Sequence, residues 1–128
     1  MKTILVTSDL TYAPRNYHDV LETILEQSRI HISAVIIVKI NLYSALGKLP
    51  YLYFTGCKNI ANTLAHNLGD LLLKRKEKLF DKHNVPYIYA GSVNAPKIIS
   101  WIQRMEPDIM LNIRARCIYQ DAILKIPR

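Results

Sequence analysis

The sequence predicts an α/β domain in which one open, parallel β-sheet lies between two layers of helices. Apolar runs rich in β-branched residues alternate with amphipathic segments from one end of the chain to the other. This alternation is typical of right-handed βαβ units. The first two apolar runs contain almost no polar residue, as expected of strands buried on both faces. The length of 128 residues fits a single domain over residues 1–128.

The first third of the chain supplies two of the expected strands. Residues 3–7 and 32–40 are the apolar runs that predict them. The segment between them begins with a loop over residues 8–14, which ends at a proline. Apolar residues then recur at helical spacing and predict a helix over residues 15–28.

The middle of the chain predicts a long connection followed by one long helix. Residues 41–57 contain Gly47, Pro50, Gly56 and four aromatic residues, so we expect an irregular connection with one helical turn at most. The aromatic rings are expected to hold this connection against the domain. Residues 58–83 carry an apolar stripe at helical spacing and predict a single helix.

The last third of the chain predicts two further strands, at residues 87–90 and 108–113. Asn94 is expected to cap the helix between them, with Pro96 in its first turn. A short helical turn is expected over residues 120–125. The result is a Rossmann-like open parallel sheet, a three-layer αβα architecture with strand order 3-2-1-4. That order leaves the apolar strand 109–113 at an open edge, so we expect it to pair with another chain or with a missing C-terminal segment of a longer polypeptide.

The charge and cysteine content indicate the environment of the protein more than its activity. The formal net charge is +7, and one basic cluster, Lys74, Arg75, Lys76 and Lys78, is interpreted as a solvated helical face. Two distant cysteines favour a reducing compartment. The longest apolar stretch, residues 34–38, is far too short for a membrane span. A cytoplasmic protein with no membrane association is therefore expected.

Ligands of open parallel sheets bind outside the carboxyl ends of the strands, where the strand order reverses. The loops expected there are residues 8–15, with Ser8, Asp9 and Arg15 as candidate substrate-binding residues, and residues 114–119. The first loop contains no glycine, so the backbone cradle of a dinucleotide or P-loop site is missing. Nicotinamide cofactors are therefore not expected. The acidic cluster of a magnesium site is not evident beyond Asp9, and no metal site is predicted.

The last third of the chain also carries short motifs of a known family. Val85-Pro86 heads a strand, Glu106-Pro107-Asp108 leads into the next, and Ile123-Leu124-Lys125-Ile126-Pro127 closes the chain. These motifs resemble the amino-terminal half of the folate-dependent formyltransferases, the family of the methionyl-tRNA, glycinamide ribonucleotide and sugar-amine formyltransferases. The resemblance covers the whole order of elements, but the sequence matches only from about residue 85 onward.

The resemblance implies transfer of a formyl group from 10-formyltetrahydrofolate, as co-substrate, to an amine of a small molecule or of a tRNA. In the family, the loop after the fourth strand lines the pterin pocket, and the matching positions here are Arg116, Cys117, Ile118 and Tyr119. The catalytic Asn-x-His of the next strand and a later Asp cannot be assigned. We therefore expect a domain truncated before the catalytic strand and inactive alone. The alternative is a non-catalytic α/β module whose basic surface binds RNA or an acidic partner.

Overall fold

The computed structural model describes residues 1–27 and 29–127 and has an all-parallel, four-stranded sheet at its centre. The strands are β1 (Lys2–Ser8), β2 (His31–Val38), β3 (Tyr87–Ala90) and β4 (Ile109–Ile113). The helical elements are η1 (Pro14–Tyr17), α1 (His18–Glu26), α2 (Leu42–Phe54), α3 (Lys58–Leu72), α4 (Arg75–Lys82), α5 (Pro96–Met105) and α6 (Asp121–Leu124). The sheet order is β3-β2-β1-β4, which confirms the predicted α/β architecture and strand order.

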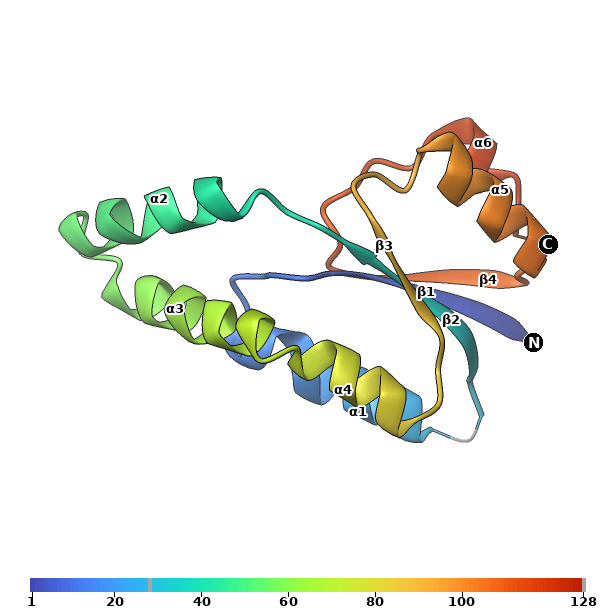
Figure 1. Cartoon of the computed structure of the whole chain (residues 1–128), viewed down its shortest axis with the longest axis horizontal. Helices are drawn as coiled ribbons and strands as arrows, with labels where there is room; N and C mark the ends of the chain where they lie inside the picture. Colours follow the sequence, from blue (N-terminus) through green and yellow to red (C-terminus); the bar gives the residue numbers. More distant parts are fainter. Residues whose placement is uncertain (28, 128) are drawn as a thin grey trace.

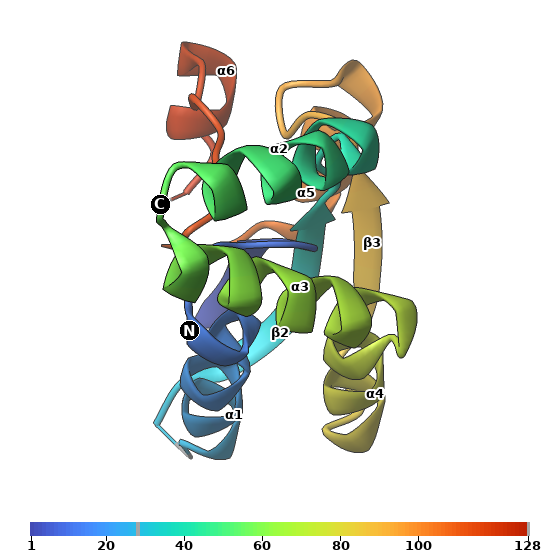
Figure 2. The same cartoon turned by 90° about the vertical axis from the view of Figure 1, so that its left-hand side faces the viewer.

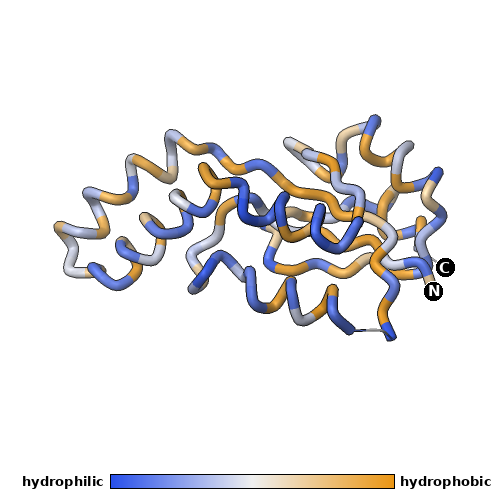
Figure 3. Tube along the Cα trace, turned by 60° about the horizontal axis from the view of Figure 1, so that its bottom comes forward, coloured by the Kyte–Doolittle hydropathy of each residue, from blue (hydrophilic) through white to orange (hydrophobic). Residues whose placement is uncertain are grey.

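Helices cover both faces of the sheet (Figure 1). On one face, Ile4 and Val6 of β1 pack with α5 and α6. On the other, Leu5 of β1 packs with Leu21 of α1 and Phe80 of α4. Neighbouring side chains of β1 thus enter different cores, because successive residues of a strand point to opposite faces. Figure 3 shows the resulting concentration of hydrophobic residues along the central strands.

The prediction of an irregular connection over residues 41–57 is wrong, because most of this segment forms the 13-residue helix α2. Asn41 caps this helix, with its side-chain oxygen accepting a hydrogen bond of 3.2 Å from the Ser44 N–H. Ala45, Leu49 and Leu52 recur at helical spacing and pack into a third core formed with α3. That packing offsets the cost of Pro50 inside the helix, which removes one backbone donor. Helices α2 and α3 therefore form a hairpin that projects from the sheet (Figures 1 and 2).

The long helix predicted over residues 58–83 is two helices, α3 and α4. Lys74 separates them with a left-handed backbone, at φ +51°. The break lets α3 pack against α2 and η1 while α4 lies on the sheet. The helix predicted over residues 15–28 starts later than expected, at His18, and its predicted end at Ser28 lies outside the described residues.

Asn94 does not cap α5, whose N-terminal cap is Ala95. Its side chain instead contacts the loop that follows β4. The Asn94 amide Nδ2 donates to the carbonyl oxygen of Ile118 at 2.7 Å, and Oδ1 accepts from the N–H of Gln120 at 3.1 Å. Asn94 therefore ties this loop to the start of α5.

Strand β4 is the outermost strand on its side of the sheet and pairs only with β1 among the described residues. Ile109, at its start, is 41% exposed. The expected pairing of this edge with another chain or a further segment stays a prediction. No helix of the described part of the chain has both the length and the apolar character needed to cross a membrane.

Phe80 tests the core between the sheet and the layer of α1 and α4. Its ring is fully buried, so Phe80→Ala is expected to lower the free energy of unfolding by about 3–5 kcal/mol, measured by urea denaturation. Leu72→Ala on α3 is the control, because Leu72 is 78% exposed and its truncation should change stability little. Equal losses in the two variants would contradict the packing described here.

Candidate functional site

The loops after β1 and β4 meet at one edge of the sheet. Thr7, near the carboxyl end of β1, forms an isolated bridge with Arg114, directly after β4. This bridge places residues 8–15 and 114–119 at the same edge, where parallel sheets bind their ligands.

A hollow of about 850 Å³ lies where these loops meet α2. Three cationic side chains, Lys48, Arg114 and Arg116, line it, and none of the described residues that line it is acidic. Tyrosines and small polar side chains supply much of the remaining wall. The members of this wall are Ser8, Thr11, Tyr12, Tyr17, Asn41, Ser44 and Tyr51. The hollow is therefore suited to an anionic ligand with a flat, partly apolar body.

Tyr12 is the aromatic centre of the cationic wall. The Nζ of Lys48 lies 5.9 Å from the centre of its ring, and the Cζ of Arg116 lies 5.6 Å from it. Both distances are in the range of cation–π attraction. The ring thus connects a cation from α2 with one from the loop after β4.

Two buried asparagines hold the loop between β1 and α1. The Asn16 Oδ1 accepts hydrogen bonds from the N–H and the hydroxyl of Thr11 at 2.7 and 2.9 Å, and its Nδ2 donates to the carbonyl of Asp9 at 2.8 Å. Asn67 of α3 donates to the carbonyls of Thr11 and Ala13 at 2.7 and 2.8 Å. Hydrogen bonds therefore join the hairpin to the loop.

Three consecutive residues of this loop, Arg15, Asn16 and Tyr17, have left-handed backbones. Asparagine adopts this conformation at little cost, whereas the two flanking side chains do so less readily. Such strain persists only where surrounding contacts impose it. It also delays the start of α1 to His18.

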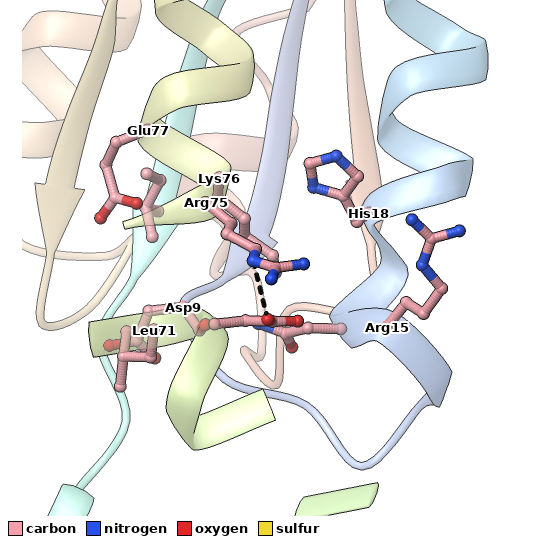
Figure 4. A pocket seen from close by; sticks show the side chains of 10 residues that line it. Asp9, Arg15, His18, Leu71, Arg75, Lys76 and Glu77 are labelled. Atoms are coloured by element: carbon pink, nitrogen blue, oxygen red, sulfur yellow. Dashed lines mark hydrogen bonds and ion pairs between the residues drawn. The ribbon is translucent and has the colours of Figure 1, made fainter. Parts of the chain in front are cut away.

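The basic cluster is a solvated face at Lys74, Arg75 and Lys78, which are exposed, but not at Lys76. Its side chain is buried, and its ammonium donates to the carbonyl oxygen of Ser8 and lies 3.5 Å from the hydroxyl of Thr7. Helix α4 presents this side of its surface to the end of β1, as Figure 4 shows. The ammonium thus satisfies backbone and side-chain acceptors at the carboxyl end of the central strand, while Lys78 on the same helix is exposed.

Burial lowers the pKa of Lys76 to about 8, although the negative charges of Asp9 and Glu77 act in the opposite direction. Burial also raises the pKa of Asp9, against hydrogen bonds to its carboxylate that include one from the Ile40 N–H at 3.1 Å. The Tyr89 hydroxyl donates to Glu77. Burial, followed by this hydrogen bond, raises the pKa of Tyr89. A polar cluster therefore lies under the loop between β1 and α1.

A second, much smaller cleft lies beside this cluster and encloses about 10 Å³, room for about one water molecule. Its charged groups are largely paired. Arg75 contacts Asp70 at 3.1 Å, the ion pair drawn in Figure 4, and Arg15 contacts Asp19 at 2.7 Å. This cleft connects α1, α3 and α4 and offers little space for a ligand.

The predicted substrate residues are divided between the two spaces. Ser8 is buried and lines the large hollow, and its hydroxyl has no hydrogen-bond partner among the described residues. Asp9 and Arg15 instead line the small cleft. The three side chains therefore do not converge on one ligand position.

The four predicted folate-binding residues also point in different directions. Arg116 lines the hollow, whereas Cys117 and Tyr119 pack against the core beneath α5. Ile118 is 86% exposed, and its carbonyl is held by Asn94. Of these four residues, Arg116 is the one that lines the hollow.

Asn16-Tyr17-His18 is an Asn-x-His triplet in this chain, but it does not supply the missing catalytic pair. It lies in the turn before α1 and not on a strand. Both polar atoms of the Asn16 amide are already used to hold the loop. His18 lines the small cleft and not the large hollow.

Sequence reasoning missed Tyr12, Lys48 and Lys76, as well as the two asparagines that hold the loop. One usable signal was the absence of any Asp or Glu between Glu26 and Asp70, which indicates an acid-free surface around Lys48. No local pattern distinguishes Lys76 from its exposed neighbours, because its burial depends on where α4 lies on the sheet.

The function of this chain has to be inferred from its own residues, because the comparisons with known proteins give no match. No known protein family matches the chain, and no curated protein matches it in sequence.

The buried amine of Lys76 predicts a specific pH dependence of stability. Its pKa is about 8 in the folded state and 10.5 in its ordinary environment. Between these values the unfolded chain binds more protons, so the free energy of unfolding rises with pH, by at most about 3 kcal/mol from this group. Urea denaturation between pH 7.5 and 10.5 should show the wild type gaining stability relative to Lys76→Met.

Lys78→Met is the matched control, because Lys78 is exposed on the same helix. Its stability difference from the wild type should change little with pH. If the difference between the wild type and Lys76→Met were also constant over this range, the amine of Lys76 would be in contact with water and its described position would be wrong.

Proposed function

We propose that this chain is the folate-side domain of a formyltransferase-like protein, which transfers a formyl group from 10-formyltetrahydrofolate to an amine. The observation that carries the proposal is the acid-free hollow with Lys48, Arg114 and Arg116 in its wall, at the edge where the loops after β1 and β4 meet. The resemblance of residues 85–127 to that family gives the hollow its expected ligand.

The chemistry of the co-substrate matches this wall. A reduced folate has a flat pterin ring at one end and the carboxylates of glutamate at the other. Guanidinium groups such as those of Arg114 and Arg116 bind carboxylates through paired hydrogen bonds. Tyrosine rings cover the face of a flat heterocycle. A hollow of about 850 Å³ is within the size range of small-molecule sites.

The reaction needs more than this binding surface. The amine nitrogen attacks the formyl carbon, the bond from that carbon to N10 of the folate breaks, the amine loses one proton, and N10 takes up one proton. A general base and donors for the developing oxyanion are required. We assign neither role to a residue of this chain, and we propose that its part is to hold the folate.

Arg116 tests the proposed folate contact. Calorimetric titration of the full chain with 5-formyltetrahydrofolate, a stable folate, should give saturable binding. Arg116→Ala should weaken it about tenfold or more, because a charge-assisted hydrogen bond contributes about 1.5–3 kcal/mol. Arg104→Ala removes the same charge from an exposed position on α5 and should leave binding unchanged. No binding by the wild type, or equal weakening in both variants, would refute the proposal.

A polyanion-binding module is the second candidate, because the same three cations and the net charge of +7 suit phosphates as well as carboxylates. Under this alternative, the affinity for a single-stranded RNA should fall steeply with salt. Three phosphate contacts predict a slope of log K against log salt of about −2.

Fluorescence anisotropy with a labelled oligonucleotide measures this slope. In the RNA-binding case, Arg116→Ala should reduce the slope by about 0.7, because one contact is lost. A wild-type slope near zero, together with folate binding, would exclude the alternative.

A further inference from the structure

Helix α2 presents an uncharged, mostly apolar face to solvent. Tyr43 and Phe54 on this face are 86% and 92% exposed. At 3.6 residues per turn, the six exposed residues that form this face fall within an arc of about 120° around the helix axis. We call this surface the α2 outer face, and its members are Leu42, Tyr43, Leu46, Pro50, Tyr53 and Phe54.

Neither the core nor the hollow uses the α2 outer face. The core uses another side of the helix, with Ala45, Leu49 and Leu52. The hollow uses a third side, with Ser44, Lys48 and Tyr51. A contiguous apolar surface that is left over in this way usually marks an interaction site.

The position of α2 makes this face accessible. The hairpin of α2 and α3 projects from the sheet, away from both termini (Figure 1). The turn between the two helices contains Gly56 and Cys57, both exposed. A flat surface could therefore approach the hairpin without meeting the rest of the domain.

The charge of the hairpin indicates which kind of partner surface it would attract. No Asp or Glu occurs between Glu26 and Asp70, whereas Lys48 and Lys58 lie on the hairpin and are exposed. Residues 41–69 carry only positive formal charge, so two copies of the hairpin offer each other no complementary charge. An anionic surface would attract the hairpin.

We propose that the α2 outer face docks on the surface of an anionic lipid bilayer, with the helix lying in the interface. An exposed helical face of aliphatic and aromatic side chains, with exposed lysines elsewhere on the hairpin and no acidic residue over residues 41–69, suits a helix that lies in the interface. Tyrosines favour this region because the ring is apolar and the hydroxyl reaches water. RNA fits less well, because three of the six members, Leu42, Leu46 and Pro50, offer no aromatic ring on which a base can stack.

This mode of binding needs no membrane-spanning segment. The short apolar stretches of the sequence argue against a span, and the expectation of no membrane association was based on them. A helix that lies in the interface buries only one face and is not limited by that length. The α2 outer face does not line the hollow, so the proposal does not depend on the folate site.

Vesicle co-sedimentation of the full chain tests the proposal. The wild type should bind vesicles of phosphatidylcholine with phosphatidylserine at least tenfold more tightly than vesicles of phosphatidylcholine alone. Phe54→Asp should weaken binding to the anionic vesicles at least tenfold, because it places a charge on the most exposed aromatic position. Leu72→Asp introduces the same charge at an exposed position of α3 outside the α2 outer face, and should bind as the wild type does.

A fluorophore at Cys57 reports whether the hairpin itself meets the lipid. Cys57 is exposed beside the end of α2, and Cys117→Ser removes the other thiol. An environment-sensitive label on Cys57 should shift its emission to the blue with anionic vesicles.

Three results would overturn the proposal. The first is no binding of the wild type to anionic vesicles. The second is equal binding of the wild type and Phe54→Asp, or equal loss in Leu72→Asp. The third is concentration-dependent self-association that Phe54→Asp abolishes without any vesicle binding, which would assign the face to a second copy of the chain.

Discussion

Strand β1 pairs with β2 along one edge and with β4 along the other, and helices cover both of its faces. Its central residues are excluded from water, so the strand can take one register and one orientation. Its carboxyl end then sets the position of the site. The loop between β1 and α1 begins at that end, and Thr7 forms its bridge to Arg114 there. The buried ammonium of Lys76 donates to the carbonyl of Ser8 at the same end.

The hairpin of α2 and α3 converts this strand end into a hollow. Without it, Arg114 and Arg116 would lie on an open edge of the sheet. Asn67 joins the hairpin to the loop after β1, and Leu64 and Leu68 pack against Leu10 and α2. Helix α2 therefore forms one wall of the hollow with one side and presents its outer face to solvent with another. The two proposals thus concern different sides of one element.

The candidate site could be predicted only in part. The edge of the sheet and the two loops that form it were predicted from the alternation of strands and helices, which indicates a parallel sheet, together with the strand order of a Rossmann-like fold. Arg116 was among the residues chosen from the sequence and faces the hollow, whereas Asp9 and Arg15 line another space. Side-chain direction in an irregular loop depends on its backbone angles. Here three left-handed residues set those angles, and no short sequence pattern signals them.

The sequence by itself determined the four strands, their parallel order and the two buried faces, because the β-branched apolar runs have only one environment that removes them from water. The tertiary structure decided where helices replace loops and which lysine is buried. Pro50 and Gly47 disfavour a helix locally, yet packing on α3 stabilises α2. Lys76 and Lys78 are chemically alike, and only the seat of α4 on the sheet buries one and exposes the other. Both outcomes depend on contacts between residues far apart in the chain, which no local pattern records.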